Sequence, residues 1–307
     1  MCNIVAGIVM YNPEDKGRFQ KSIDSVLKQV SHVYIFDNST SKTLYQFPDT
    51  ITYMTKAENK GIAYALNRIM EAARKDGFDW VVTMDQDSIL PDNTISIYEQ
   101  HIHNNPSLAI ICPQVIDTRR SYMKIKKEPK EEYVDFCITS ASCTRIKAWE
   151  QVGKFDEWLF IDLVDNEFCK RLIVSGYKIL RLNELVLDQE FGKIIPKSEK
   201  MQRFWNKVAT TLHNKNFAKF GYSKFVSPIR VYYTNRNIIY VNRKLRNYGK
   251  IGYENYNCKS YFGFLVSFSV PSILRANEKG KVIRAVLKGM RDGKRIHPVV
   301  WQLNRNR

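Results

Sequence analysis

Two aspartates one residue apart, Asp85 and Asp87, carry the strongest chemical signal in the chain. They directly follow Trp80–Met84, an apolar run that predicts a strand buried on both faces. Two carboxylates placed in this way can approach one divalent cation, because Mg²⁺ takes one or two carboxylates together with water and substrate phosphates. A calcium loop is disfavoured, since its oxygen-ligand and glycine positions hold Ile89 and Leu90. The alternative is an ordinary turn or a helix N-cap at the strand end.

Polar residues also follow two other predicted strands. The apolar run Asn3–Met10 leads into Tyr11, Asn12 and Pro13, and the run Val33–Phe36 leads into Asp37, Asn38 and Ser39. Ligands of open α/β sheets bind beyond the carboxyl ends of the strands, so three polar strand ends at one edge indicate a shared site. Each group alone is compatible with turn chemistry, because Asn, Asp, Ser and Pro are the usual turn formers.

Two further segments contain candidate site residues. Asn59, Lys60 and Gly61 open a predicted helix over residues 62–75, where they either face an anion or simply cap the helix, and capping is favoured. Asp162 and Asp165 stand among large apolar residues, which would raise the pKa of a carboxylate toward that of a general base. Asp165 is equally placed to cap a helix predicted over residues 164–175, and the spacing does not decide between the two roles.

The chain as a whole predicts an α/β protein. Strands are expected at residues 3–10, 33–36, 51–54, 80–84, 108–112 and 177–182, with helices at 19–30, 62–75 and 164–175 between them. This alternation predicts a mostly parallel, right-handed doubly wound sheet. We expect a catalytic or binding domain over residues 1–200 and a basic, aromatic-rich helical region over residues 201–307. Residues 117–132 are charged and are expected to form a mobile loop rather than a site.

The charge is uneven along the chain. The net charge is +17, yet residues 193–307 hold 25 basic and 4 acidic residues, which gives this part alone +21. A helix over residues 281–295 combines an apolar stripe with a cationic face, so it either lies on an anionic membrane or docks on its own domain. Nucleic acid is not expected as a partner, because no nucleic-acid-binding motif is found. The apolar run over residues 262–274 is shorter than the ~20 residues of a membrane-spanning helix. Six cysteines without C-x-x-C spacing argue against a zinc site and fit a reducing cytosol.

Several of these segments together resemble a known family. They are VMYNP (9–13), FDNST (36–40), ENKGIAYALN (58–67), WVVTMDQDS (80–88), ITSAS (138–142) and GKFDEWLFIDLVDNEFCKRLIVSGYKI (153–179). In this order they are similar to the inverting family 2 glycosyltransferases with the GT-A fold, and most similar to the bacterial rhamnosyltransferase branch. The resemblance spans residues 3–192 and continues weakly through YYTNRN (232–237).

The resemblance implies a nucleotide-sugar site at the first two sets of strand ends. Tyr11 and Asn12 would line the nucleotide pocket, and Asp37 would hydrogen-bond the pyrimidine base. Asn59 and Gly61 would form the wall beside the base and the ribose. Asp85 would approach the ribose and the metal, while Asp87 would hold Mg²⁺ or Mn²⁺ against the diphosphate.

The same resemblance assigns the chemical step. Asp165 falls where these enzymes keep their catalytic base, with Val164 in place of the usual Glu, and Asp162 is the second choice or an acceptor-binding group. Thr139 and Ser140 would border the acceptor, and Arg236 would contact the diphosphate. Gln189 stands where the family commonly has a histidine, which puts the dependence on metal in doubt.

The implied reaction is transfer of a sugar from a nucleotide to a glycan. The branch implies dTDP-L-rhamnose as the donor, with a UDP-linked hexose, N-acetylhexosamine or galactofuranose as the alternative. The acceptor would be a lipid-diphosphate-linked O-antigen or capsule intermediate, at the inner face of the cytoplasmic membrane. A nucleotide- or polyanion-binding module without turnover is the non-enzymatic alternative. A nucleotidyltransferase is disfavoured, because residues 9–19 supply a poor version of the Gly-rich basic loop that such enzymes use.

Overall fold

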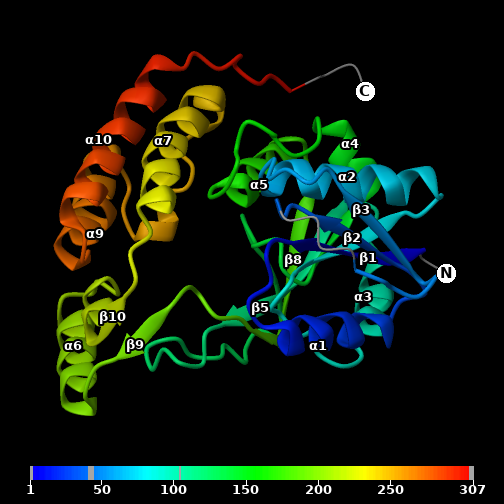
Figure 1. Ribbon diagram of the computed structural model, residues 1–307, viewed down its shortest axis with the longest axis horizontal. Coiled ribbons are helices and arrows are strands. Elements are labelled where there is room, and N and C mark those ends of the chain that lie inside the picture. The colour runs from blue at the N-terminus through cyan, green and yellow to red at the C-terminus, as the bar shows by residue number, and fades with distance from the viewer. Residues whose placement is uncertain (1–2, 41–44, 104, 304–307) are drawn as a thin grey trace. The chain divides into compact units, whose positions relative to one another are not determined.

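The computed structural model describes residues 3–40, 45–103 and 105–303 (Figure 1). The chain divides into two compact units. The first comprises Met1–Ile116, Ile125–Phe160 and Val164–Gln189, and the second comprises Asp117–Lys124, Ile161–Leu163 and Glu190–Arg307. The boundary that we predict at residue 200 therefore lies inside the second unit.

A mixed sheet forms the centre of the first unit. Within the described residues its eight strands have the order β3-β2-β1-β4-β7-β5-β8-β6. They are β1 (Ile4–Met10), β2 (Val33–Asp37), β3 (Ile51–Thr55), β4 (Trp80–Asp85), β5 (Leu108–Ile116), β6 (Glu131–Tyr133), β7 (Ser142–Arg145) and β8 (Lys178–Asp188). β6 and β7 run antiparallel to the other six, so the predicted mostly parallel α/β sheet is confirmed.

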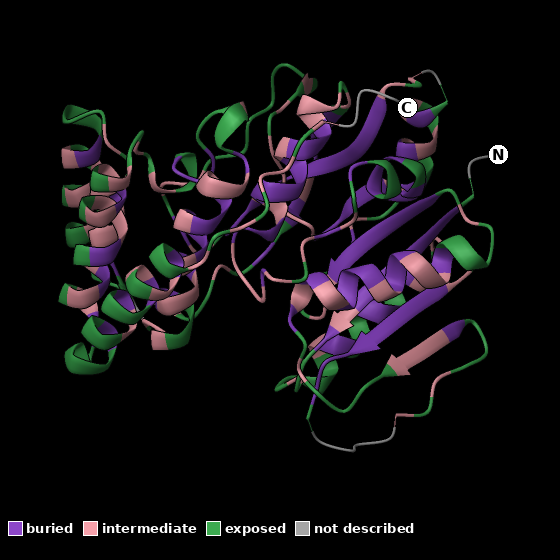
Figure 2. Ribbon diagram, turned by 90° about the horizontal axis from the view of Figure 1, so that it is seen from above, coloured by how far each residue is buried: buried purple, intermediate pink, exposed green. Residues whose placement is uncertain are grey.

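Helices cover both faces of this sheet. They are α1 (Lys16–Leu27), α2 (Ile62–Lys75), α3 (Thr94–Ile102), α4 (Ile146–Gln151) and α5 (Val164–Val174). Figure 1 shows α1 and α3 on one side and α2, α4 and α5 on the other, while Figure 2 shows the strands as mostly buried. Gly7 of β1 permits the close approach of α2, because a Cβ atom there would lie 2.2 Å from Cγ2 of Ile69.

The second unit is mainly helical. Its elements are β9 (Ile194–Pro196), α6 (Glu199–Thr211), the 3-10 turn η1 (Phe217–Gly221), β10 (Tyr222–Lys224), α7 (Pro228–Lys244), the 3-10 turns η2 (Arg246–Tyr248) and η3 (Glu254–Tyr256), α8 (Tyr261–Phe264), the π-helical turn η4 (Leu265–Ser269), α9 (Val270–Arg275) and α10 (Lys279–Arg295). None of the described helices has both the length and the apolar character needed to cross a membrane.

α10 docks on α7, as one of the two alternatives for this helix in the sequence predicts. A Cβ atom on Gly289 would lie 2.5 Å from the carbonyl oxygen of Tyr232, so glycine lets the two backbones meet. Val282 and Val286 are buried in the same interface. Leu287, which belongs to the same predicted apolar stripe, is 61% exposed. The stripe is therefore divided between the docked side of α10 and its outer surface.

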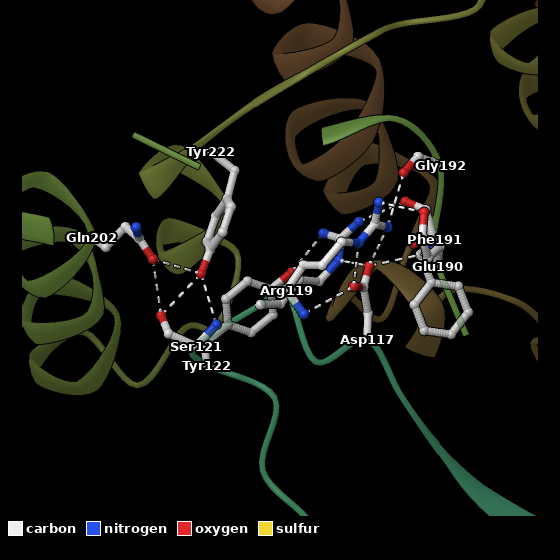
Figure 3. A network of polar contacts seen from close by, with 10 residues as sticks. Asp117, Arg119, Ser121, Tyr122, Glu190, Phe191, Gly192, Gln202 and Tyr222 are labelled. Carbon is white, nitrogen blue, oxygen red and sulfur yellow. Dashed lines mark hydrogen bonds and ion pairs between the residues drawn. The ribbon is translucent and has the colours of Figure 1, made fainter. Parts of the chain in front are cut away.

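The expectation of a mobile loop over residues 117–132 is wrong for the first part of that segment. The carboxylate of Asp117 is fully buried and accepts hydrogen bonds from Arg119 Nε (2.8 Å), Arg120 Nε (2.8 Å) and the backbone N–H of Phe191 (3.1 Å) (Figure 3). Burial alone would raise the pKa of Asp117, but the hydrogen bonds from the two arginines outweigh it and hold that pKa well below its usual range. The charges of Asp117, Arg119 and Arg120 are therefore paired rather than solvated.

Candidate active site

The carboxyl ends of β1, β2 and β4 meet at one edge of the sheet. In the strand register Met10 lies opposite Asp37, and Val9 lies opposite Asp85. Because the three strands are parallel neighbours, the residues that follow them leave the sheet on the same side. The structure thus brings together the three sets of polar strand ends that the sequence predicts.

A side-chain amide joins the first and third of these strand ends. The N–H of Tyr11 donates to Oε1 of Gln86 (2.7 Å), and Nε2 of Gln86 donates back to the carbonyl oxygen of Tyr11 (3.1 Å). Gln86 lies between Asp85 and Asp87, so this pair of bonds fixes the turn that carries both carboxylates. The side chain of Tyr11 itself is about half exposed at the edge of the sheet.

Asn12 links the first strand end to the second. Its N–H donates to the hydroxyl of Ser39 (2.8 Å), and its backbone adopts a φ of 39°. Non-glycine residues seldom adopt positive φ, and asparagine is among those that tolerate it best. Strained backbone of this kind clusters at ligand-binding sites, and the side chain of Asn12 is exposed.

Asp37 lies beneath the edge rather than on it. Its carboxylate is 1% exposed, with Oδ1 accepting from the N–H of Ser39 (2.7 Å) and Oδ2 accepting from the hydroxyl of Tyr53 (2.6 Å). Burial, followed by the hydrogen bond to Asp37, raises the pKa of Tyr53 well above its usual value. Both oxygens of Asp37 therefore organise the strand ends on which a nucleotide would rest.

Asn59 and Gly61 form the start of α2. Oδ1 of Asn59 accepts from the N–H of Gly61 (3.0 Å), and the carbonyl oxygen of Phe160 accepts from the N–H of Ile62 (2.8 Å). Gly61 has a φ of 91°, and a Cβ atom there would lie 2.6 Å from the Phe160 carbonyl oxygen. Its own carbonyl oxygen accepts from Nδ2 of Asn38 (3.0 Å). Protein groups thus bind the N–H groups of Gly61 and Ile62, although α2 has no side-chain N-cap bond.

Asp85 is half-buried at the end of β4 and is held from two directions. Its N–H donates to the hydroxyl of Ser140 (3.3 Å), and Nε2 of Gln189 donates a short hydrogen bond to its carboxylate. The other amide atom of Gln189, Oε1, is buried and has no hydrogen-bond partner among the described residues. A buried carbonyl oxygen without a partner is uncommon in folded proteins, and here it belongs to the amide whose nitrogen is bonded to the carboxylate of Asp85.

Asp87 is exposed, and the carbonyl oxygen of its backbone accepts from Nε of Arg18 (2.6 Å). No cluster of three or more His, Cys, Asp or Glu side chains able to hold a metal occurs in the parts of the chain that the structure describes. The residues nevertheless fit a divalent cation, because Asp85 supplies a carboxylate and Gln189, bonded to it through Nε2, carries an amide oxygen that has no partner in the described chain. Mg²⁺ and Mn²⁺ sites of this kind complete their shell with diphosphate and water.

Asp165 stands in the first turn of α5. It lines a small pocket together with Thr139, Cys137 and Cys169. The hydroxyl of Thr83 in β4 donates to the carbonyl oxygen of Thr139 (2.6 Å), which fixes this wall of the pocket to the sheet. The hydrogen bond with Cys137 and then burial raise the pKa of the Cys169 thiol well above its usual value, so the thiol beside Asp165 is neutral.

Asp162 and Arg236 belong to the second unit. Asp162 has a φ of 64°, pairs with the guanidinium of Arg230 and accepts from the hydroxyl of Thr234 (3.2 Å). The prediction that Asp162 has apolar surroundings is therefore wrong, because two residues of α7 give its carboxylate a cationic and a polar partner. Arg236 lies over the rings of Tyr233 (4.7 Å) and Tyr232 (5.7 Å), and burial lowers its pKa.

The comparisons with known proteins agree with this arrangement. The family described as Glycosyl transferase family 2 matches residues 6–155, which contain the strand ends and both aspartates that follow β4. Residues 6–155 therefore match the family 2 glycosyltransferases, and the chain is a glycosyltransferase. This glycosyltransferase is 28% identical over 263 residues to the dTDP-rhamnosyl transferase RfbF of Shigella flexneri, covering 79% of this chain and 80% of that one.

Solved structures support the fold of this glycosyltransferase. The mannosyltransferase PcManGT from Pyrobaculum calidifontis, solved with GDP-Man and Mn²⁺, aligns with a TM-score of 0.52 and 12% identity, covering 92% of this chain and 73% of that one. TarS of S. aureus aligns with a TM-score of 0.51 and 12% identity, covering 94% of this chain and 55% of that one. The α/β sheet of the first unit is thus the GT-A sheet that the sequence predicts.

Sequence reasoning missed two residues of this glycosyltransferase that the structure places at the site. Gln86 forms two hydrogen bonds with the backbone of Tyr11. The sequence feature that could have indicated this role is the position of Gln86 between the two aspartates. Arg18 reaches the backbone of Asp87 from α1. Nothing in the spacing of Arg18 distinguishes it from the other cations of that helix, because the contact joins residues 69 positions apart.

Proposed function

We propose that this glycosyltransferase transfers L-rhamnose from dTDP-L-rhamnose, with inversion at the anomeric carbon, to a lipid-linked polysaccharide intermediate of an O-antigen or capsule. The observation that carries the proposal is the similarity to a dTDP-rhamnosyl transferase, which extends over four-fifths of both chains. The converging ends of β1, β2 and β4 supply the place for the nucleotide, since ligands of such sheets bind beyond the strand ends.

In this proposal the nucleotide lies along the ends of β1 and β2. Tyr11 is exposed there and Asn12 presents its side chain from a strained backbone, so both are suited to touch the ligand. Asp37 borders the base and holds Ser39 and Tyr53 in place. Asn59 and Gly61 form the wall beside the base and ribose at the start of α2.

Asp85 and Asp87, with Gln189, are the residues proposed to hold Mg²⁺ or Mn²⁺. The solved relative PcManGT contains GDP-Man together with Mn²⁺, which supports a metal in this transferase as well. When bound, the cation would offset the negative charge of the departing nucleoside diphosphate. Arg18 adds a protein cation at the same turn, and Arg236 is proposed as a further diphosphate contact.

Asp165 is proposed as the general base. Its carboxylate takes the proton from an acceptor hydroxyl as that oxygen bonds to the anomeric carbon, while the bond from that carbon to the diphosphate oxygen breaks with its electron pair. The attack from the opposite face inverts the configuration. Thr139 shares the pocket with Asp165 and, with Ser140, would border the acceptor. Asp162, held by Arg230, suits the alternative role of an acceptor-binding group better than that of a base.

The acceptor is proposed to be a glycan on a lipid diphosphate, met at the inner face of the cytoplasmic membrane. The support is electrostatic, because residues 193–307 carry 25 basic and 4 acidic side chains. Each well-placed basic residue contributes roughly 1 kcal/mol to attraction toward an anionic membrane surface.

A thermal-shift panel of nucleotide sugars, with and without Mn²⁺, tests the donor. We expect dTDP-L-rhamnose to raise the melting temperature most, and to raise it further with Mn²⁺, because a ligand at ~100 times its Kd adds about 2.7 kcal/mol to the free energy of unfolding. A larger shift with a UDP-linked hexose, N-acetylhexosamine or galactofuranose would overturn the choice of donor. The absence of a shift with every nucleotide sugar would overturn the function.

A further inference from the structure

Exposed apolar side chains are concentrated in the second unit. Of the 17 large apolar residues exposed in the described chain, 13 lie in this unit. Four of them repeat at intervals of four residues along α8, η4 and α9, and we call them the apolar ridge: Phe262, Val266, Val270 and Leu274. Their exposed fractions are 75%, 53%, 47% and 64%. A continuous exposed row of this kind indicates an interaction surface, whereas isolated exposed apolar residues are common on all proteins.

The geometry of the helix keeps the ridge on one side. Along an α-helix of 3.6 residues per turn, a spacing of four residues drifts around the axis with each step. The π-helical turn over Leu265–Ser269 takes up an extra residue, which reduces this drift between Val266 and Val270. π-turns of this type occur frequently at functional sites.

The opposite side of the same helix is fully used for packing. Phe264 is buried and its ring stacks on Phe268 with centroids 5.3 Å apart. The hydroxyl of Ser269 is also buried and donates to Oδ1 of Asn235 on α7 (2.8 Å). The inner side therefore fixes the helix in the unit, and the ridge is not needed to hold it there.

Cations surround the ridge along the chain. Lys259, which precedes α8, is exposed, whereas Arg275 after Leu274 turns inward, with its guanidinium over the ring of Phe220 (5.7 Å). α10, which packs against α9, exposes further basic side chains: Lys281, Arg284, Lys288, Arg291 and Lys294. Among residues 193–307 the acidic side chains number 4 against 25 basic ones. The part of the unit that carries the ridge thus combines exposed apolar side chains with an excess of positive charge, although Lys281, Lys288 and Arg291 also pair with Glu278 or Asp292.

This combination selects one kind of occupant. A second copy of the chain seated on the ridge would bring two sets of α10 cations together, and like charges repel. A bilayer with anionic lipids offers apolar acyl chains and negative headgroups in one surface, and helices with this pattern lie in the interface about 5–10 Å deep. Lysine and arginine keep their charged ends at the headgroups while their stems cover apolar surface.

We propose that the apolar ridge inserts into the headgroup–acyl boundary of an anionic membrane, with the cations of α10 on the headgroups. The proposal rests on the proposed function in one respect, since it names the surface by which the enzyme reaches a lipid-linked acceptor. It assigns insertion to the helix over residues 261–275, whereas the basic helix α10 supplies the electrostatic attraction.

Vesicle flotation of the full chain tests this assignment. The wild type is expected to float with vesicles of phosphatidylcholine and phosphatidylglycerol, and the double variant Phe262→Ser/Leu274→Ser is expected to bind them at least tenfold more weakly. Leu212→Ser, which alters an equally exposed apolar residue of the same unit, is expected to bind as the wild type does. A wild type that does not float, or a ridge variant that binds as the wild type does, would overturn the proposal.

Two further measurements keep the test independent of folding and of catalysis. In Val266→Trp we expect brominated lipid to quench the fluorescence of the introduced tryptophan. In Leu212→Trp we expect no such quenching, and equal quenching in the two variants would contradict insertion at the ridge. The ridge variant is expected to keep the thermal shift with dTDP, because none of the residues proposed to bind the nucleotide belongs to the ridge. Absence of that shift in the wild type would overturn the proposed function and leave the vesicle result standing.

The oligomeric state gives a further outcome. A wild-type dimer that the ridge variant abolishes would make a second copy the occupant of the ridge and overturn the proposal.

Discussion

Gln189 donates a hydrogen bond from Nε2 to the carboxylate of Asp85, while its Oε1 is buried without a hydrogen-bond partner in the described part of the chain. The amide nitrogen thus faces the carboxylate, and the neutral amide oxygen is left without a partner. A cation between the two groups would draw the amide oxygen toward the carboxylate and give Oε1 the partner it lacks. A substitution at residue 189 is therefore expected to change the affinity of the protein for metal.

Gln189→His is expected to raise the affinity for Mn²⁺ in the presence of dTDP by about tenfold, because a neutral imidazole binds Mn²⁺ better than an amide oxygen does. Titration calorimetry with Mn²⁺ measures the change, and Gln20→His on the exposed side of α1 serves as the control. An unchanged Mn²⁺ affinity in Gln189→His would remove residue 189 from the metal site.

Asp87→Asn is expected to weaken Mn²⁺-dependent binding of dTDP-L-rhamnose at least tenfold while leaving the melting temperature of the free protein within about a degree. The carboxylate is exposed, so its loss leaves no buried group unpaired. Isothermal titration with and without Mn²⁺ separates the two contributions. Equal weakening in the absence of metal would show that Asp87 acts on the donor directly.

Glu167 and Arg171 form a buried pair within α5, the helix that carries Asp165. Arg171 donates to both oxygens of Glu167 at 2.8 and 2.7 Å, and the two side chains are at most 1% exposed. Glu167→Gln leaves a buried guanidinium without its counter-charge, so we expect the free energy of unfolding to fall by about 3 kcal/mol. Urea denaturation measures it.

The control for that prediction is Glu150→Gln, which removes an ion pair to Arg74 that is about half exposed. Exposed pairs contribute little, so the expected loss is below about 1 kcal/mol. A loss in Glu167→Gln no larger than in this control would mean that the buried pair adds nothing to stability.

Glu132 makes the stability of the first unit depend on pH. Hydrogen bonds from Lys126, and then from Asn183 and Arg181, lower the pKa of Glu132 from 4.5 to about 2. A carboxyl whose pKa is lower in the folded state stabilises the fold above its unfolded pKa, and this stabilisation is lost as the pH falls from about 4.5 to about 2. The gap in unfolding free energy between wild type and Glu132→Gln should therefore be about 1 kcal/mol at pH 6 and shrink by pH 3.

Urea denaturation at both pH values gives this difference, and Glu131→Gln is the matched control. Glu131 is exposed, and within the described chain its carboxylate forms an ion pair with His101. A gap for Glu132→Gln that is the same at pH 6 and pH 3 would contradict the lowered pKa.

The fold and the sheet edge could be predicted because they depend on local patterns. Runs such as Trp80–Met84 are apolar throughout, as strands buried on both faces require, and the predicted helix over residues 62–75 coincides with α2. The polar residues after each strand then share an edge through the geometry of parallel strands. Glu167 and Arg171 also had a local signal, the i,i+4 spacing of opposite charges on one helix.

What could not be predicted depends on contacts between distant parts of the chain. The charged neighbours of Asp117 predict a mobile loop, yet its carboxylate is held by the N–H of Phe191, 74 residues away, and by Arg119 and Arg120. The sequence predicts apolar neighbours for Asp162, whereas its partner Arg230 lies 68 residues away. Spacing in the sequence carries no information on such pairs.

The most direct test of the central claim is the release of dTDP from dTDP-L-rhamnose by the wild type and by Asp165→Asn, in the presence of a membrane fraction that contains the acceptor. We expect Asp165→Asn to keep the thermal shift with dTDP-L-rhamnose and to lose activity by about 10² to 10⁴-fold, the usual contribution of a general base. Asp135→Asn, at an exposed position of the same unit, is expected to retain full activity. Turnover by Asp165→Asn at the wild-type rate would contradict the account.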